Sequence, residues 1–96
     1  MAYNLVLATQ TKEVLRELDR TEQLFLGKSI QRALAAVAEG RLKPNLEAPD
    51  GHITVYLEDS AYFMTYRNLA PGEQGTESGE GVLIARLELP LGPPPY

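Results

Sequence analysis

The order of hydrophobic patterns along this chain restricts its fold more than any other feature of the sequence. An alternating segment at residues 3–8 is followed by two segments with helical spacing, and three further strand-like segments follow residue 52. A chain of 96 residues has the length of one domain with one modest core. The sequence therefore predicts an α+β fold of order β-α-α-β-β-β, in which two helices pack on one face of a small, mostly antiparallel four-stranded sheet.

Two helices are predicted in the first half of the chain. The first covers about residues 12–20, and Thr9 or Thr11 can cap its amino end. A short break separates it from the second helix, for which Thr21 is the predicted N-cap and Gly40 the predicted end. The apolar face of this second helix consists of Leu26, Ile30, Ala33, Leu34 and Val37.

Three strands are predicted in the second half. Residues 53–58 alternate between apolar and polar side chains, and a short turn at residues 58–61 leads into a second alternating segment at residues 62–69. This pattern predicts an antiparallel hairpin. The last strand is predicted at residues 82–89, where Pro90 ends it.

The connecting segments are marked by proline and glycine. Residues 42–51 hold two prolines and an Asp-Gly pair, which predict irregular structure between the second helix and the hairpin. Residues 71–81 are rich in glycine and glutamate and are predicted to form a solvated, mobile loop. We expect a single α+β domain over residues 1–90 and a proline-rich extended tail at residues 91–96.

The net charge of −4 is unevenly distributed. Residues 1–48 carry seven Lys or Arg side chains against six Asp or Glu, whereas residues 49–96 carry two against seven. The strand-rich half therefore supplies only Arg67 and Arg86 as cations, which is too few for the cationic patch that displaces counterions from phosphates. We expect nucleic acid to be at most a weak partner.

The composition also restricts metals, cofactors and location. The chain has no cysteine, which excludes disulfides and thiolate metal sites. Its one histidine, His52, lies in a predicted turn without a second ligand, so we expect neither a metal nor a cofactor. The amino-terminal segment lacks a basic n-region, and its apolar run is too short for a signal peptide or a membrane span. We expect a soluble, cytoplasmic protein without a membrane partner.

This order of elements resembles the RelE/ParE toxin superfamily, the small toxins of bacterial toxin–antitoxin operons. The resemblance covers about residues 3–89. It lies in the opening strand that runs into a helix at residues 3–18, in the second helix with its proline-bearing loop, and in the hairpin at residues 55–66. The resemblance implies a toxin or toxin-derived protein, with an antitoxin or another protein as its partner.

The candidate site residues come from the same resemblance and from strand alternation. Family members that cleave messenger RNA need cationic or hydroxyl groups to activate a ribose hydroxyl and to bind the charge that develops on phosphorus. The weak catalytic candidates here are Tyr56, Arg67 and Arg86, which alternation places on the open face of the sheet. Glu58 and Glu88 are predicted to point the same way and to oppose a phosphate.

Two positions depart from the family pattern. Family members carry an arginine just after the hairpin turn, where this chain has Phe63, and a His-Arg pair in the last strand, where it has Ala85 and Arg86. These losses argue against a complete ribonuclease site. The ParE-like branch, which is linked to inhibition of DNA gyrase and lacks a nuclease site, tolerates them better.

The residues also have purely structural interpretations. The two strand arginines can pair with cross-strand acids in solvent, and the tyrosines can be half-buried sheet residues. A non-enzymatic protein-interaction module on the same α+β scaffold therefore remains the alternative to a toxin, and a small enzyme of another class is a third hypothesis. The sequence leaves the cellular target, the identity of the partner and the formation of homo-oligomers open.

Overall fold

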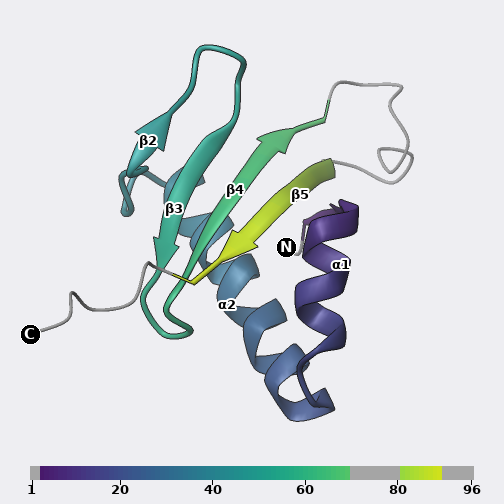
Figure 1. Cartoon of the computed structure of the whole chain (residues 1–96). Helices are drawn as coiled ribbons and strands as arrows, with labels where there is room; N and C mark the ends of the chain where they lie inside the picture. Colours follow the sequence, from purple (N-terminus) through teal and green to yellow (C-terminus); the bar gives the residue numbers. More distant parts are fainter. Residues whose placement is uncertain (1–2, 70–80, 90–96) are drawn as a thin grey trace, which may run out of the picture.

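The computed structural model describes residues 3–69 and 81–89. The described elements are two helices and a five-stranded sheet with the strand order β1-β5-β4-β3-β2. Figure 1 shows the helices α1 and α2 lying on the same face of the sheet. The elements are β1 (Asn4–Leu7), α1 (Thr9–Arg16), α2 (Arg20–Ala38), β2 (Leu46–Glu47), β3 (Ile53–Leu57), β4 (Tyr62–Asn68) and β5 (Gly81–Glu88). Strands β1 and β5 are parallel, and the other neighbours are antiparallel. The predicted α+β class is confirmed, but the predicted number of four strands is wrong.

The additional strand is β2, which lies in the segment predicted to be irregular. Leu46 pairs with Thr54 and Glu47 with Ile53 at the edge of the sheet. Asn45 fixes the start of this pairing, because its backbone N–H donates to the carbonyl of Thr54 over 2.8 Å. Two paired residues are too few to show a period in the sequence, so alternation could not predict this strand.

The core lies between the sheet and α2, with α1 covering β5. The apolar residues of β3 and β4 alternate with residues on the opposite face, as a half-buried antiparallel hairpin requires. The predicted turn at residues 58–61 is present between these two strands. The buried apolar residues are Leu26, Ile30, Ala33, Leu34, Val55, Leu57, Met64, Tyr66, Val82, Ile84 and Leu87.

The first helix begins differently from the prediction. Its N-cap is Ala8, whose side chain makes no capping hydrogen bond, and Thr9 is already the first helical residue. Neither Thr9 nor Thr11 is a cap, because β1 ends at Leu7 and the chain passes into α1 within one residue. Thr11 is instead fully buried, and its hydroxyl donates to the carbonyl of Ile84 over 2.8 Å.

The second helix has a different N-cap from the one predicted. Asp19 accepts a hydrogen bond from the backbone N–H of Glu22, and the Glu22 carboxylate accepts one from the backbone N–H of Asp19, which together form a capping box. Thr21 therefore lies inside the first turn. The predicted end is confirmed, since Gly40 follows the C-cap with φ of +77°.

Two predicted segments lie beyond the described residues. The tail at residues 91–96 falls wholly outside them, and of the predicted loop at residues 71–81 only Gly81 is described, as the first residue of β5. The predicted domain limits therefore stay a prediction. Among the described residues, neither helix has the length and apolar character needed to cross a bilayer.

Candidate functional site

Both helices of the described part of the chain lie on one face of the sheet, and we call the other face the open face. It is turned away from α1 and α2 (Figure 1) and lies opposite the buried side chains of β3, β4 and β5. The strand registers place Leu46, Thr54, Tyr56, Phe63, Thr65, Arg67, Leu83, Arg86 and Glu88 there. All three candidates from the sequence, Tyr56, Arg67 and Arg86, thus lie on one surface.

The three candidates occupy three neighbouring rows across the strands. Tyr56 lies in the row that ends with Glu88, and Arg86 lies in the next row, opposite Thr65. Arg67 lies two residues beyond Thr65 along β4, opposite Leu83. The fold therefore brings the three residues onto one surface but spreads them along the strands.

A β-bulge in β5 sets the direction of Arg86. Two neighbouring residues of β4 pair with Ile84 and Arg86, so Ala85 is an extra residue on β5. Without it, strict alternation from Ile84 would turn Arg86 toward the helices and Leu87 toward solvent. With the bulge, Leu87 is 1% exposed in the core and Arg86 lies on the open face.

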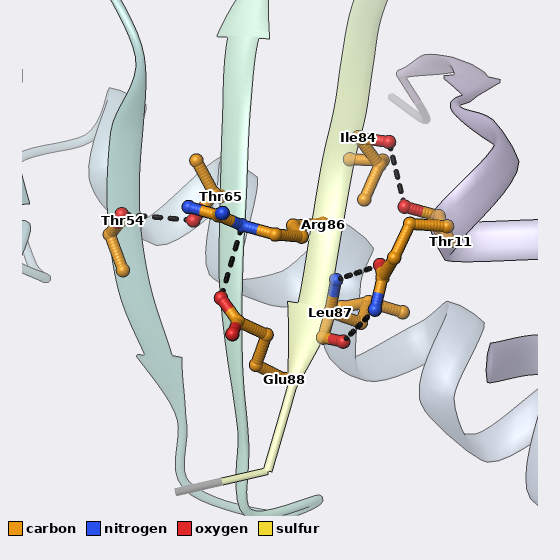
Figure 2. Close-up of polar contacts among 8 residues, drawn as sticks. Thr11, Thr54, Thr65, Ile84, Arg86, Leu87 and Glu88 are labelled. Carbon is orange, nitrogen blue, oxygen red and sulfur yellow. Dashed lines mark hydrogen bonds and ion pairs between the residues drawn. The ribbon is translucent and has the colours of Figure 1, made fainter.

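Arg86 is paired within its own strand. Its Nε atom lies 3.0 Å from Oε1 of Glu88, and the two side chains are 56% and 54% exposed. Figure 2 shows the Arg86 side chain extending across β4 over Thr65, with Glu88 beside it. The predicted opposition by Glu88 is therefore present, because this carboxylate offsets the charge that a phosphate would meet.

Glu58 lies just past the end of β3, outside the rows of paired strand residues. It follows β3 and belongs to the hairpin turn, so the alternation of the strand does not extend to it. It lines a hollow beside α2 together with Arg32 and Asp59. Arg32 and Asp59 form an ion pair of 2.5 Å across this hollow, which ties the hairpin turn to the second helix.

Aromatic side chains occupy the row next to Arg86. The ring centroids of Tyr56 and Phe63 lie 5.0 Å apart with an angle of 50° between the ring planes. Such tilted pairs add favourable contact energy beyond the area they bury. Because Tyr56 and Phe63 occupy this part of the open face, it is an apolar contact surface and not a cationic one.

A hollow of about 380 Å³ opens on the same face. Its lining consists of Leu46, Ala48, Asp50, His52, Thr54, Thr65, Ala85 and Arg86. The hydroxyl oxygens of Thr54 and Thr65 lie 3.0 Å apart, and Figure 2 draws Thr65 at the guanidinium end of the Arg86 side chain. Thr65 is only 9% exposed, so it forms part of the floor of this hollow.

Asp50 and His52 form one wall of the hollow. The backbone N–H of His52 donates to Oδ1 of Asp50 over 3.0 Å, and this hydrogen bond lowers the pKa of the Asp50 carboxyl. The Nδ1 atom of His52 lies 3.1 Å from the same oxygen, yet it has no hydrogen bond of acceptable geometry to any described residue.

Sequence reasoning missed the place of His52 beside the candidate residues. It was interpreted as an isolated turn histidine, whereas the fold puts it in the same hollow as Thr54 and Arg86. The signal was available, because His52, Thr54 and Tyr56 follow one another at a spacing of two residues. The strand β2 could not be predicted from the sequence, and its Leu46 lines the hollow together with Ala48 from the loop that follows.

The charges of the open face nearly cancel. Arg67 and Arg86 are matched by Glu88 and by Asp50 at the wall of the hollow. Among the described residues, no group of three His, Cys, Asp or Glu side chains could hold a metal ion. The surface combines aromatic, hydroxyl and balanced charged groups, which suits contact with a polar protein surface better than contact with a phosphate chain.

Comparison with known proteins gives no match for this chain: no protein-family model, no curated protein and no solved structure matches it.

Proposed function

We propose that this chain is a RelE/ParE-like toxin, or a toxin-derived protein, of a toxin–antitoxin system, and that it acts in the cytoplasm by binding. The observation that carries the proposal is a sheet covered by helices on one face only, with Tyr56, Arg67 and Arg86 together on the uncovered face. This surface is the working surface of the proposed toxin. The antitoxin, or another protein partner, would bind the molecule and restrain it.

The proposal excludes a complete ribonuclease site. Cleavage of RNA needs groups that take a proton from the ribose hydroxyl and cations that stabilise the charge on phosphorus. Here Phe63 stands at the position of one family cation, and the guanidinium of Arg86 is already in contact with Glu88. Two strand arginines on separate rows, one of them paired with a carboxylate, support contact with a target and not phosphoryl chemistry.

The second candidate function is a protein-interaction module without toxicity. It is favoured by exposed apolar side chains on α2, where Leu24 is 58% exposed and Phe25 46% exposed. Leu24 also lines an open hollow of about 540 Å³, together with Leu5 on the sheet edge and Gly27 on the helix. Apolar surface of this kind marks a site for a protein partner.

The proposal is tested by inducing the gene in a bacterial host and following growth and transcript integrity. The informative variant is Arg86→Ala, and the matched control is Arg41→Ala. Arg41 is also an exposed arginine in an ion pair, 2.8 Å from Glu39, but it lies beyond the end of α2 and not on the open face. Both substitutions remove one exposed cation, so they differ mainly in location.

The toxin proposal expects growth arrest that Arg86→Ala relieves and Arg41→Ala does not, with messenger RNA intact. Arrest with cleaved messenger RNA would overturn the claim that a ribonuclease site is incomplete. Normal growth with abundant soluble protein would favour the interaction module. Capture of one defined partner, lost on Leu24→Glu but not on Arg86→Ala, would then support that second function.

A further inference from the structure

We infer that Gln10 and Thr11, in the first turn of α1, are positioning residues for Arg86, because they hold the β-bulge that directs its side chain to the open face. The inference rests on the proposed function only in treating Arg86 as part of the working surface. The contacts involved are drawn in Figure 2, where Thr11 approaches Ile84 and two further hydrogen bonds reach the backbone of Leu87.

The parallel pairing of β1 with β5 stops just before the bulge. The backbone N–H of Ala8 donates to the carbonyl of Ile84 over 3.1 Å, and the chain then turns into α1. Beyond this point, none of the strands in residues 3–69 and 81–89 neighbours β5 on that side. The backbone groups of Leu87 would therefore be left without partners in a place where Leu87 is buried.

The side chain of Gln10 takes the place of the missing strand. Its Nε2 donates to the carbonyl of Leu87 over 3.0 Å, and its Oε1 accepts from the N–H of Leu87, also over 3.0 Å. A carboxamide has one donor side and one acceptor side, as a peptide group has, so it can extend a ladder by one step. Gln10 thus continues the β1–β5 pairing from within a helix.

Thr11 holds the other flank of the bulge. Its hydroxyl donates to the carbonyl of Ile84, which also accepts from Ala8, and Thr11 is fully buried. The residues on either side of Ala85 and Arg86 are therefore fixed by two successive residues of α1. Between two fixed flanks the bulge has one arrangement, with Leu87 in the core and Arg86 outside.

This arrangement connects the helical side of the molecule to the open face. If the flanks are released, the extra residue can move along β5, and each step of the register exchanges the sides of Arg86 and Leu87. A partner that displaces the first turn of α1 would therefore redirect Arg86 without touching it. The contacts of Gln10 with Leu87 favour the arrangement in which Arg86 faces the open side.

The chain contains a matched control for Gln10. The carboxamide of Gln31 on α2 makes the same pair of contacts with Tyr3, accepting from its N–H over 2.8 Å and donating to its carbonyl over 2.9 Å. Tyr3 precedes β1, and neither residue pairs with β5. Gln31→Ala therefore removes an equivalent helix-to-backbone contact while leaving the bulge intact.

The test is amide hydrogen exchange and nuclear Overhauser spectroscopy on wild type, Gln10→Ala and Gln31→Ala. We expect exchange at the Leu87 amide to rise about five- to tenfold in Gln10→Ala, the size expected for one lost hydrogen bond, with amides in β3 unchanged. The cross-strand contact between Thr65 and Arg86 should weaken in the same variant. Gln31→Ala should leave both signals unchanged.

The inference is overturned if Gln10→Ala keeps the Leu87 protection and the Thr65–Arg86 contact, or if both variants loosen the whole sheet equally. Should Gln10→Ala fail to fold, Gln10→Glu decides: its ionised carboxylate can accept from the N–H of Leu87 but cannot donate to the carbonyl, so the Thr65–Arg86 contact should weaken relative to wild type. Thr11→Val keeps the shape of the side chain but removes the hydroxyl, whereas Thr11→Ser keeps the hydroxyl. Only Thr11→Ser should therefore retain the bulge. These readouts do not depend on toxicity, so they can fail or succeed independently of the proposed function.

Discussion

The guanidinium of Arg86 and the carboxylate of Glu88 meet on the open face at 3.0 Å, although both belong to the same strand. Arg86 and Glu88 are two residues apart on β5 and therefore share a face, and the bulge at Ala85 turns both of them to the open face. The contact gives the one arginine in the hollow a local counter-charge. The working surface is therefore balanced in charge, which favours selective contact over attachment to a polyanion.

Removing this counter-charge should change binding more than folding. We expect Glu88→Gln to alter the free energy of unfolding by less than about 1 kcal/mol, because exposed ion pairs contribute little. The same substitution should increase the affinity of the open face for anions such as inorganic phosphate, measured by titration. Glu39→Gln, which frees Arg41, is the control. Equal phosphate affinity in the two variants would contradict the role given to Glu88.

The hairpin turn contains a residue under conformational strain. Ala61 has φ of +63°, a left-handed conformation that glycine adopts without steric cost. We expect Ala61→Gly to stabilise the protein by about 0.5–1 kcal/mol in urea denaturation. Ala38→Gly, at the exposed end of α2, should lower stability instead. A loss of stability in Ala61→Gly would show that the turn is not strained at this residue.

Inside α2 the reverse substitution, glycine to alanine, should stabilise the protein. A Cβ atom added at Gly27 would meet nothing within 4 Å, so alanine fits without displacement. We expect Gly27→Ala to raise the free energy of unfolding by about 1 kcal/mol, because alanine favours the helix. If a partner occupies the hollow beside Leu24, the same variant should bind it less well, since the new methyl group narrows the hollow. Unchanged stability would point to a close contact at this position in solution.

The ion pair at the hairpin turn should make stability depend on acid pH. The pKa of the Asp59 carboxyl lies below its usual 3.8, first through a backbone N–H of its own residue and then through Ser29 and Arg32. A lowered pKa stabilises the folded state above the usual value, and this stabilisation is lost as the pH falls below 3.8. We expect Asp59→Asn to flatten the decline in thermal stability between neutral and acid pH. Glu58→Gln controls for the removal of one negative charge. Equal flattening in both variants would show that the acid dependence does not come from the carboxyl of Asp59 in particular.

The sequence predicted the helices and the hairpin because each shows its period over several turns or pairs. The face of α2 that runs from Leu26 to Val37 and the alternation from Ile53 to Leu57 pack as expected. The strand β2 was missed because two residues show no period. The caps were misassigned because a threonine near a helix start can serve other purposes than capping. The hydroxyl of Thr11 bonds to the neighbouring strand β5, and the carboxylate of Asp19 is the group that caps α2.

The candidate site could be predicted only in part. Alternation correctly placed Arg86 with Tyr56 and Arg67, but the same rule applied from Ile84 would place Arg86 in the core. The bulge resolves this conflict, and it depends on a contact between residues 77 positions apart in the sequence, Gln10 and Leu87. Such long-range contacts leave no local pattern. The hollow around His52 was hidden for the same reason, because its wall is formed by the loop that carries β2.

The most direct test of the account compares growth after induction of wild type, Arg86→Ala, Gln10→Ala and Gln31→Ala at equal levels of soluble protein. The account predicts that wild type and Gln31→Ala arrest growth, and that Arg86→Ala and Gln10→Ala both relieve the arrest. Arrest by all four proteins would contradict the place of Arg86 on the working surface. Undiminished growth with soluble, folded wild-type protein would contradict the toxin function itself.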